Sequence, residues 1–145
     1  MTRVLGIDLG TKRIGLALSD PSGIIASPLA TLAHRSMRED VERVATLCAS
    51  HGVTSVVVGW PRNMDGTPGP AARQAETFAG RLRAQTGLPV ELWDERLSTV
   101  AADRAMIRGG ARREDRRLTR DRVAAAMMLQ SCLDARASRS PRERS

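Results

Sequence analysis

The chain has 145 residues, of which 41% are hydrophobic and 27% charged, as is typical of one soluble globular domain large enough to fold without disulfides. No apolar run approaches the roughly 20 residues of a membrane span, and the N-terminus lacks a signal-peptide core, so we expect a cytoplasmic protein with no membrane partner. The net charge of +7 is uneven: +1 over residues 1–100 and +6 over residues 101–145. A basic third of the chain can indicate a polyanionic partner, or its arginines can simply keep the surface and the tail soluble, and charge alone favours neither interpretation.

The N-terminal third predicts a meander of strands. Three extended segments are joined by turns of Gly, Pro and Asp composition: Arg3–Asp8, Ile14–Ser19 and Ile24–Leu32. Such short connections indicate antiparallel pairing. Ser36 and Glu39 then form a capping box that begins a helix, which we expect to end at His51 and Gly52.

The rest of the chain alternates strands with helices. We predict a buried strand at Val53–Gly59, a loop at Pro61–Pro70, a helix at Ala71–Thr86, a strand at Val90–Trp93, a helix from Ser98 or Thr99 to about Arg108, a basic loop at Ala111–Leu118 and a last helix at Thr119–Ala135. This order predicts an α/β fold: a mixed five-stranded sheet, first an antiparallel meander and then βαβ crossovers, with helices on both faces. We expect residues 1–136 to form the domain and residues 137–145 a disordered basic tail.

Three carboxylate positions are candidates for catalysis. Asp8 ends the first strand, Asp94 and Glu95 end the fifth, and Asp121 is predicted in the first turn of the last helix. Each has a purely structural explanation, a turn-forming aspartate or a favourable helix dipole. If they converge, like charges about 4 Å apart repel by about 4 kcal/mol at an effective dielectric of 20, so a cation or a proton must neutralise them. Mg²⁺ or Mn²⁺ suits such ligands, and a pair of ions suits phosphodiester hydrolysis.

Four segments resemble one known family. GIDLGTKRIGLA (6–17), VVVGWPRNMDGT (56–67), WDERLSTVAA (93–102) and DRVAAAMMLQSCLD (121–134) are similar, in order and spacing, to the YqgF-type (RuvX) family. The resemblance implies an RNase H-like fold and a metal-dependent nuclease that matures the 5′ end of pre-16S rRNA, with Holliday-junction resolution as the alternative. It also implies that Asp8, Glu95 and Asp121 hold Mg²⁺ or Mn²⁺, Asp8 bridging two ions.

Further residues are expected to contact the nucleic-acid backbone. The resemblance suggests phosphate-positioning roles for Lys12, Arg13, Asn63, Arg96, Ser98 and Thr99. The basic loop before Asp121 is expected to reach phosphates flanking the scissile bond through Arg112, Arg113, Arg116 and Arg117. Trp60 departs from the smaller apolar residue usual in the family. His34 and His51 have no partner pattern and are expected to be surface or capping residues, and Cys48 and Cys132 to be buried, reduced thiols.

Two other classes of protein compete with a nuclease. The segment GIDLGTKRIG also resembles the first phosphate hairpin of actin-like and sugar-kinase proteins, but those need a second lobe that 145 residues do not provide. A non-catalytic nucleic-acid-binding module is the other alternative, and the three retained carboxylates disfavour it. The scarcity of aromatic residues disfavours a base-stacking platform and favours recognition of an RNA stem, precursor rRNA or branched DNA. RNA or DNA as substrate, and a monomer or a homodimer, stay open.

Overall fold

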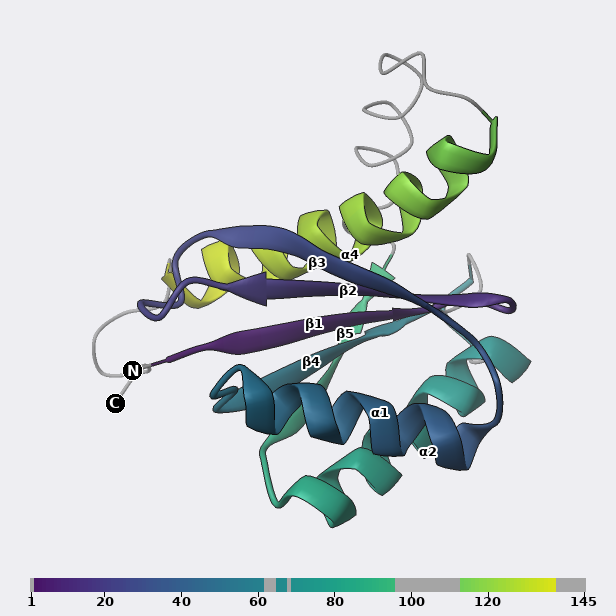
Figure 1. Ribbon diagram of the computed structural model, residues 1–145, viewed down its shortest axis with the longest axis horizontal. Helices are drawn as coiled ribbons and strands as arrows, with labels where there is room; N and C mark the ends of the chain where they lie inside the picture. Colours follow the sequence, from purple (N-terminus) through teal and green to yellow (C-terminus); the bar gives the residue numbers. More distant parts are fainter. Residues whose placement is uncertain (1, 62–64, 68, 96–112, 138–145) are drawn as a thin grey trace.

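A computed structural model describes residues 2–61, 65–67, 69–95 and 113–137. Its strands are β1 (Val4–Leu9), β2 (Arg13–Ser19), β3 (Ala26–Ala33), β4 (Ser55–Trp60) and β5 (Val90–Asp94). Its helices are α1 (Met37–Ser50), α2 (Pro70–Thr86) and α4 (Arg113–Ala137). The strands form one sheet in the order β3-β2-β1-β4-β5, with α1 and α2 on one face and α4 on the other (Figure 1). None of the described helices is long and apolar enough to span a membrane.

The pairing confirms the predicted mixed sheet. β1 pairs antiparallel with β2, and β2 with β3, as short turns require. β4 then pairs parallel with β1, and β5 parallel with β4, each after a helical crossover. The carboxyl ends of β1, β4 and β5 therefore lie at the same edge of the sheet.

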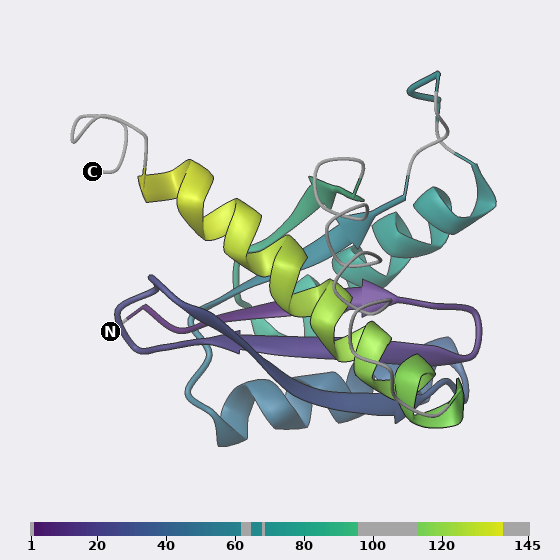
Figure 2. The ribbon, with the colours of Figure 1, turned by 90° about the horizontal axis from the view of Figure 1, so that it is seen from above.

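Alternation along the strands divides the core into two layers. Leu5 and Ile7 of β1 pack with α1 and α2, whereas Val4 packs with α4, because successive side chains of a strand point to opposite faces. α4 crosses the strands obliquely (Figure 2). Gly6 permits its close approach: a Cβ at Gly6 would lie 2.9 Å from Cβ of Leu129.

Local signals for α1 and α2 are confirmed. The Ser36 hydroxyl accepts a hydrogen bond from the Glu39 amide at 3.1 Å, capping α1 at its N-terminus. Gly87, with a φ of 72°, ends α2 in the left-handed conformation that favours glycine. The two buried cysteines carry free thiols, as expected.

Two of the predicted boundaries that the structure corrects have a local physical reason. β3 begins at Ala26, not Ile24, because the Asp20 carboxylate accepts hydrogen bonds from the amides of Ile24 and Ile25, at 2.7 and 2.9 Å, and holds both residues in the turn. Residues 113–118, predicted as a loop, are helical. No Gly or Pro interrupts the chain from 111 to 137, and arginine and leucine are good helix formers, so the charge of this segment did not prevent a helix.

Candidate active site

Asp8 lies near the end of β1, half-buried and paired with Gly15 of β2. Every second residue of a strand points to the same face of the sheet. Asp8 is therefore on the same face as Val4 and Gly6, which is the face covered by α4. On the other side of β1 the pairing with β4 runs up to Ile7 and Val58. Asp8 and Gly59 are the next residues of these two parallel strands, and Gly59 belongs to the same face as Val57, which packs under α4.

Glu95 comes to Asp8 from the end of β5. Its carboxylate lies directly over Gly59, where any Cβ would collide with it. Burial raises the pKa of Glu95 to about 9, helped by a hydrogen bond with Asp8 and by the negative charges of Asp8 and Asp94. A raised pKa favours the protonated form of Glu95, whose carboxyl group can donate a hydrogen bond to the Asp8 carboxylate. Two of the three predicted carboxylates, far apart in sequence, thus meet at one sheet edge.

Asp94 is the last residue of β5 and pairs with Trp60. By the same alternation, Asp94 is on the face of Val90 and Leu92, which pack with α1 and α2. This is the face opposite Trp93 and α4. Its charge nevertheless raises the pKa of Glu95. Trp60, the departure from the family pattern, packs against the α1–α2 core.

The third predicted carboxylate belongs to a different part of its helix than expected. α4 begins at Arg113, so Asp121 is in the third turn and does not open the helix. A helix dipole acts on the first turn only, so the structural explanation of Asp121 as a dipole-stabilising residue is wrong. The position of its side chain is outside the described part of the structure.

The remaining predicted site residues are only partly described. Lys12 is exposed in the β1–β2 turn, and Arg13 begins β2. Arg113, Arg116 and Arg117 belong to the first two turns of α4. Five predicted site residues lie outside the described part of the chain: Asn63, Arg96, Ser98, Thr99 and Arg112. The predicted helix that ends near Arg108 lies outside it as well.

Sequence reasoning missed Gly59. A side chain at this position would occupy the space of the Glu95 carboxylate, so the glycine is required for the contact with Asp8. The signal was available: Gly59 interrupts a run of valines, and glycine inside a strand often marks the close approach of another group.

The expectations for both histidines are confirmed: His34 lies at the surface and His51 caps a helix, although His34 also has a partner that the sequence did not indicate. His34 pairs through Nδ1 with the carboxylate of Asp40, a buried residue of α1. His51 is the C-cap of α1, with its amide donating to the carbonyl oxygen of Leu47 at 3.0 Å.

The donor set at the sheet edge suits a hard cation. Carboxylate oxygens are the ligands that Mg²⁺ and Mn²⁺ prefer, and the raised pKa of Glu95 follows from its burial and from the negative charges of Asp8 and Asp94 beside it. Within the described residues, no group of three carboxylate, histidine or cysteine side chains is arranged to hold a metal.

Comparisons with known proteins show to which family the chain belongs. Residues 2–135 match the model of the RuvX family, described as a Holliday junction resolvase. A protein of Geobacillus kaustophilus (strain HTA426) named "Putative pre-16S rRNA nuclease" is 48% identical over 136 residues, covering 92% of this chain and 99% of its own. A protein of the same name from Symbiobacterium thermophilum is 48% identical over 139 residues, covering 96% of each chain.

Two solved structures share the fold. Thermus thermophilus RuvC in complex with a Holliday junction substrate has a TM-score of 0.56 at 19% identity, over 95% of this chain and 97% of that one. The fowlpox virus Holliday junction resolvase has a TM-score of 0.55 at 13% identity, over 92% of this chain and 99% of that one. At these identities the likeness establishes the fold alone, whereas the family match and the 48% identity establish kinship. The chain belongs to the RuvX family and has the RNase H-like fold of RuvC.

Proposed function

We propose that this protein is a divalent-metal-dependent nuclease that cleaves precursor 16S rRNA. The observation that carries the proposal is the contact of Asp8 with Glu95 at the carboxyl edge of the sheet. The names of the relatives at 48% identity support precursor rRNA as the substrate. The family description supports a Holliday junction as the second candidate.

Asp8, Glu95 and Asp121 are the proposed ligands of Mg²⁺ or Mn²⁺. The carbonyl oxygen of Ala125 lies 3.4 Å from a Cβ built on Gly6. Asp121 precedes Ala125 by one helical turn, and Asp8 follows Gly6 by two residues on the face that meets α4, so the backbones support a third ligand from α4. A bound pair of ions would supply Lewis-acid stabilisation of the charge that develops on the phosphate oxygens. Glu95 holds a proton when no cation is present and must release it on ligation.

The substrate is tested by comparing cleavage of three nucleic acids in Mg²⁺ or Mn²⁺. These are a precursor 16S rRNA fragment with its 5′ leader, a four-way DNA junction and a plain duplex. We expect the rRNA fragment to be cleaved fastest. We expect no cleavage of it in buffer that contains EDTA and no added Mg²⁺ or Mn²⁺. Faster cleavage of the junction would transfer the proposal to DNA resolution. Binding without cleavage of any substrate would identify a non-catalytic module.

Gly59→Ala should lower the cleavage rate about 10–100-fold, as changes to the support of metal ligands do. The added methyl group displaces the Glu95 carboxylate from its place over β4. Gly80→Ala is the matched control, because a Cβ there meets nothing within 4 Å. It should leave the rate unchanged and stabilise α2 by about 0.5–1 kcal/mol. Wild-type turnover by Gly59→Ala would show that the position of Glu95 is unimportant for cleavage.

The arginines that open α4 are proposed to hold phosphates. In a helix, positions 113, 116, 117 and 120 recur with the i, i+3, i+4, i+7 spacing that gathers positions on one side. Replacing Arg113, Arg116 and Arg117 with Gln should flatten the slope of log K against log salt by about 2–3 units on duplex DNA, since each neutralised phosphate contributes about 0.9. Sequence preference should not change.

The control for this variant changes the same charge elsewhere. It replaces Arg139, Arg142 and Arg144 near the C-terminus with Gln, and its salt slope should stay within one unit of wild type. Equal slopes for the two triple variants, measured by fluorescence anisotropy from 50 to 300 mM salt, would mean that overall charge and not the start of α4 grips the phosphates.

A further inference from the structure

A cavity lies at the same edge of the sheet as Asp8, on the opposite face. It has a volume of about 350 Å³, within the range of about 300–1,000 Å³ usual for ligand sites. Its lining comes from the end of β1 and the β1–β2 turn, from His34 after β3, and from α1 and α2. Leu9, which lines it, directly follows Asp8, and successive strand residues point to opposite faces. The carboxylates and the cavity are thus separated by the thickness of one strand end.

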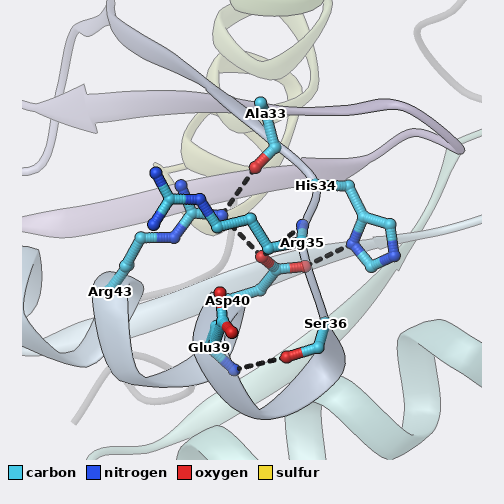
Figure 3. Close-up of polar contacts among 7 residues, drawn as sticks. All are labelled: Ala33, His34, Arg35, Ser36, Glu39, Asp40 and Arg43. Carbon is cyan, nitrogen blue, oxygen red and sulfur yellow. Dashed lines mark hydrogen bonds and ion pairs between the residues drawn. The ribbon is translucent and has the colours of Figure 1, made fainter.

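Asp40 is the polar centre of this cavity. It is only 2% exposed, and its carboxylate accepts hydrogen bonds from the Arg35 amide at 3.1 Å and from Nη2 of Arg43 at 2.5 Å (Figure 3). Burial alone would raise the pKa of Asp40, but the hydrogen bonds from Arg43, Arg35 and His34 outweigh it and hold the pKa below its usual range. Asp40 is therefore an anion whose charge Arg43 balances, and Arg43 is itself fixed by the Ala33 carbonyl oxygen at 2.6 Å.

This arrangement orients the imidazole of His34. Its Nδ1 is turned toward Asp40 and its other ring nitrogen away from the carboxylate (Figure 3). A carboxylate partner makes Nδ1 the protonated nitrogen, which in the neutral ring leaves Nε2 as a hydrogen-bond acceptor. No other described residue bonds to the His34 side chain. The amide of Gln74, exposed on α2, and the hydroxyl of Thr11 add donors and acceptors to the lining.

The lining favours a neutral planar ligand over a phosphate. No described lining residue is Lys or Arg, and the nearby Arg43 is already paired with Asp40, so a phosphate would meet no positive side chain among the described lining residues. Leu9 and Met37, both half-buried, provide apolar surface, and His34 and Gln74 provide hydrogen bonds. Apolar surface with hydrogen-bonding groups along one side is how proteins hold an unstacked nucleobase.

We propose that this cavity receives an unstacked base of the nucleic-acid substrate. The proposal rests on the proposed nuclease function and adds a base-binding subsite to it. A strand that crosses the sheet edge passes Asp8 on one face and the cavity on the other. Lys12, exposed in the β1–β2 turn between the two, is placed to meet the phosphate that connects them.

The test measures binding without cleavage. The ¹⁵N-labelled full-length protein is titrated with adenosine, guanosine, cytidine and uridine, and separately with orthophosphate, while the imidazole nitrogens of both histidines are followed by NMR. At least one nucleoside should shift the His34 nitrogens and leave those of His51 in place, and orthophosphate should shift neither. Gln74→Ala should weaken nucleoside binding roughly 3–10-fold, as loss of one hydrogen bond does. The matched control Gln85→Ala, three turns further along α2, should not.

Two outcomes would overturn the base subsite. One is that no nucleoside shifts the His34 nitrogens, or that orthophosphate shifts them equally. The other is nucleoside affinity unchanged in Gln74→Ala, which would leave the Asp40 network as a purely structural cap between β3 and α1. Asp8→Asn should bind nucleosides as the wild type does, so a failure of the nuclease proposal is distinguishable from a failure of this one.

Discussion

Asp8→Asn should abolish metal-dependent cleavage while the protein stays folded. The substitution removes one charged ligand oxygen without changing the size of the side chain, and Asp8 is half-buried and outside both hydrophobic clusters. Mutation of a residue that only supports a metal ligand already lowers activity about 10–100-fold. For loss of the proposed ligand itself we expect a cleavage rate at least about 10²–10³-fold lower. The measurement is the single-turnover rate on the precursor rRNA fragment at saturating Mg²⁺ and Mn²⁺, with circular dichroism to confirm the fold.

Asp134→Asn is the control for this experiment. It makes the same chemical change on α4, where Asp134 accepts a hydrogen bond from Gln130 at 2.9 Å, far along the helix from Asp121. Its cleavage rate should match the wild type. Turnover by folded Asp8→Asn within a few-fold of wild type would remove Asp8 from the proposed metal site.

Glu95→Gln should stabilise the metal-free protein at pH 8. Burial and the neighbouring Asp8 and Asp94 raise the pKa of Glu95 from 4.5 to about 9. Between these values the native protein holds a proton that the unfolded chain has released, so wild-type stability falls as the pH rises through this window. Each pKa unit corresponds to about 1.4 kcal/mol, and allowing for rearrangement of the carboxylates we expect a gain of roughly 1–3 kcal/mol from the neutral amide. The difference should vanish near pH 4, where both states are protonated.

Addition of metal should reverse the order of stability. A cation that binds only the native state stabilises it by RT ln(1 + [L]/Kd), about 2.7 kcal/mol at one hundred times Kd. Wild type should therefore gain stability on titration with Mn²⁺, and Glu95→Gln much less. Thermal melts at pH 4 to 9, with EDTA or Mn²⁺, measure both effects. Glu76→Gln, exposed on α2, should behave as wild type throughout. Equal Mn²⁺ shifts in wild type and Glu95→Gln would exclude Glu95 as a ligand.

The order of the described elements and the type of sheet follow from local features of the sequence. Local signals decide such features: Ser36 caps α1 through its own hydroxyl, and Gly87 ends α2 because only glycine adopts its conformation without strain. Short turns require antiparallel neighbours, and helical crossovers parallel ones. The resemblance of four segments to one family also indicated the carboxylates, although each alone had an ordinary structural explanation.

Which functional groups lie in contact depends on the packing of the folded chain. The contact of Glu95 with Asp8 depends on β5 pairing in register with β4, β4 with β1, and on the missing side chain of Gly59 between them. The pairing of His34 with Asp40 depends likewise on how the end of β3 lies against α1. Neither contact has a local signature, because the residues are brought together by strand register and packing, and their altered protonation follows from burial that only the folded chain creates.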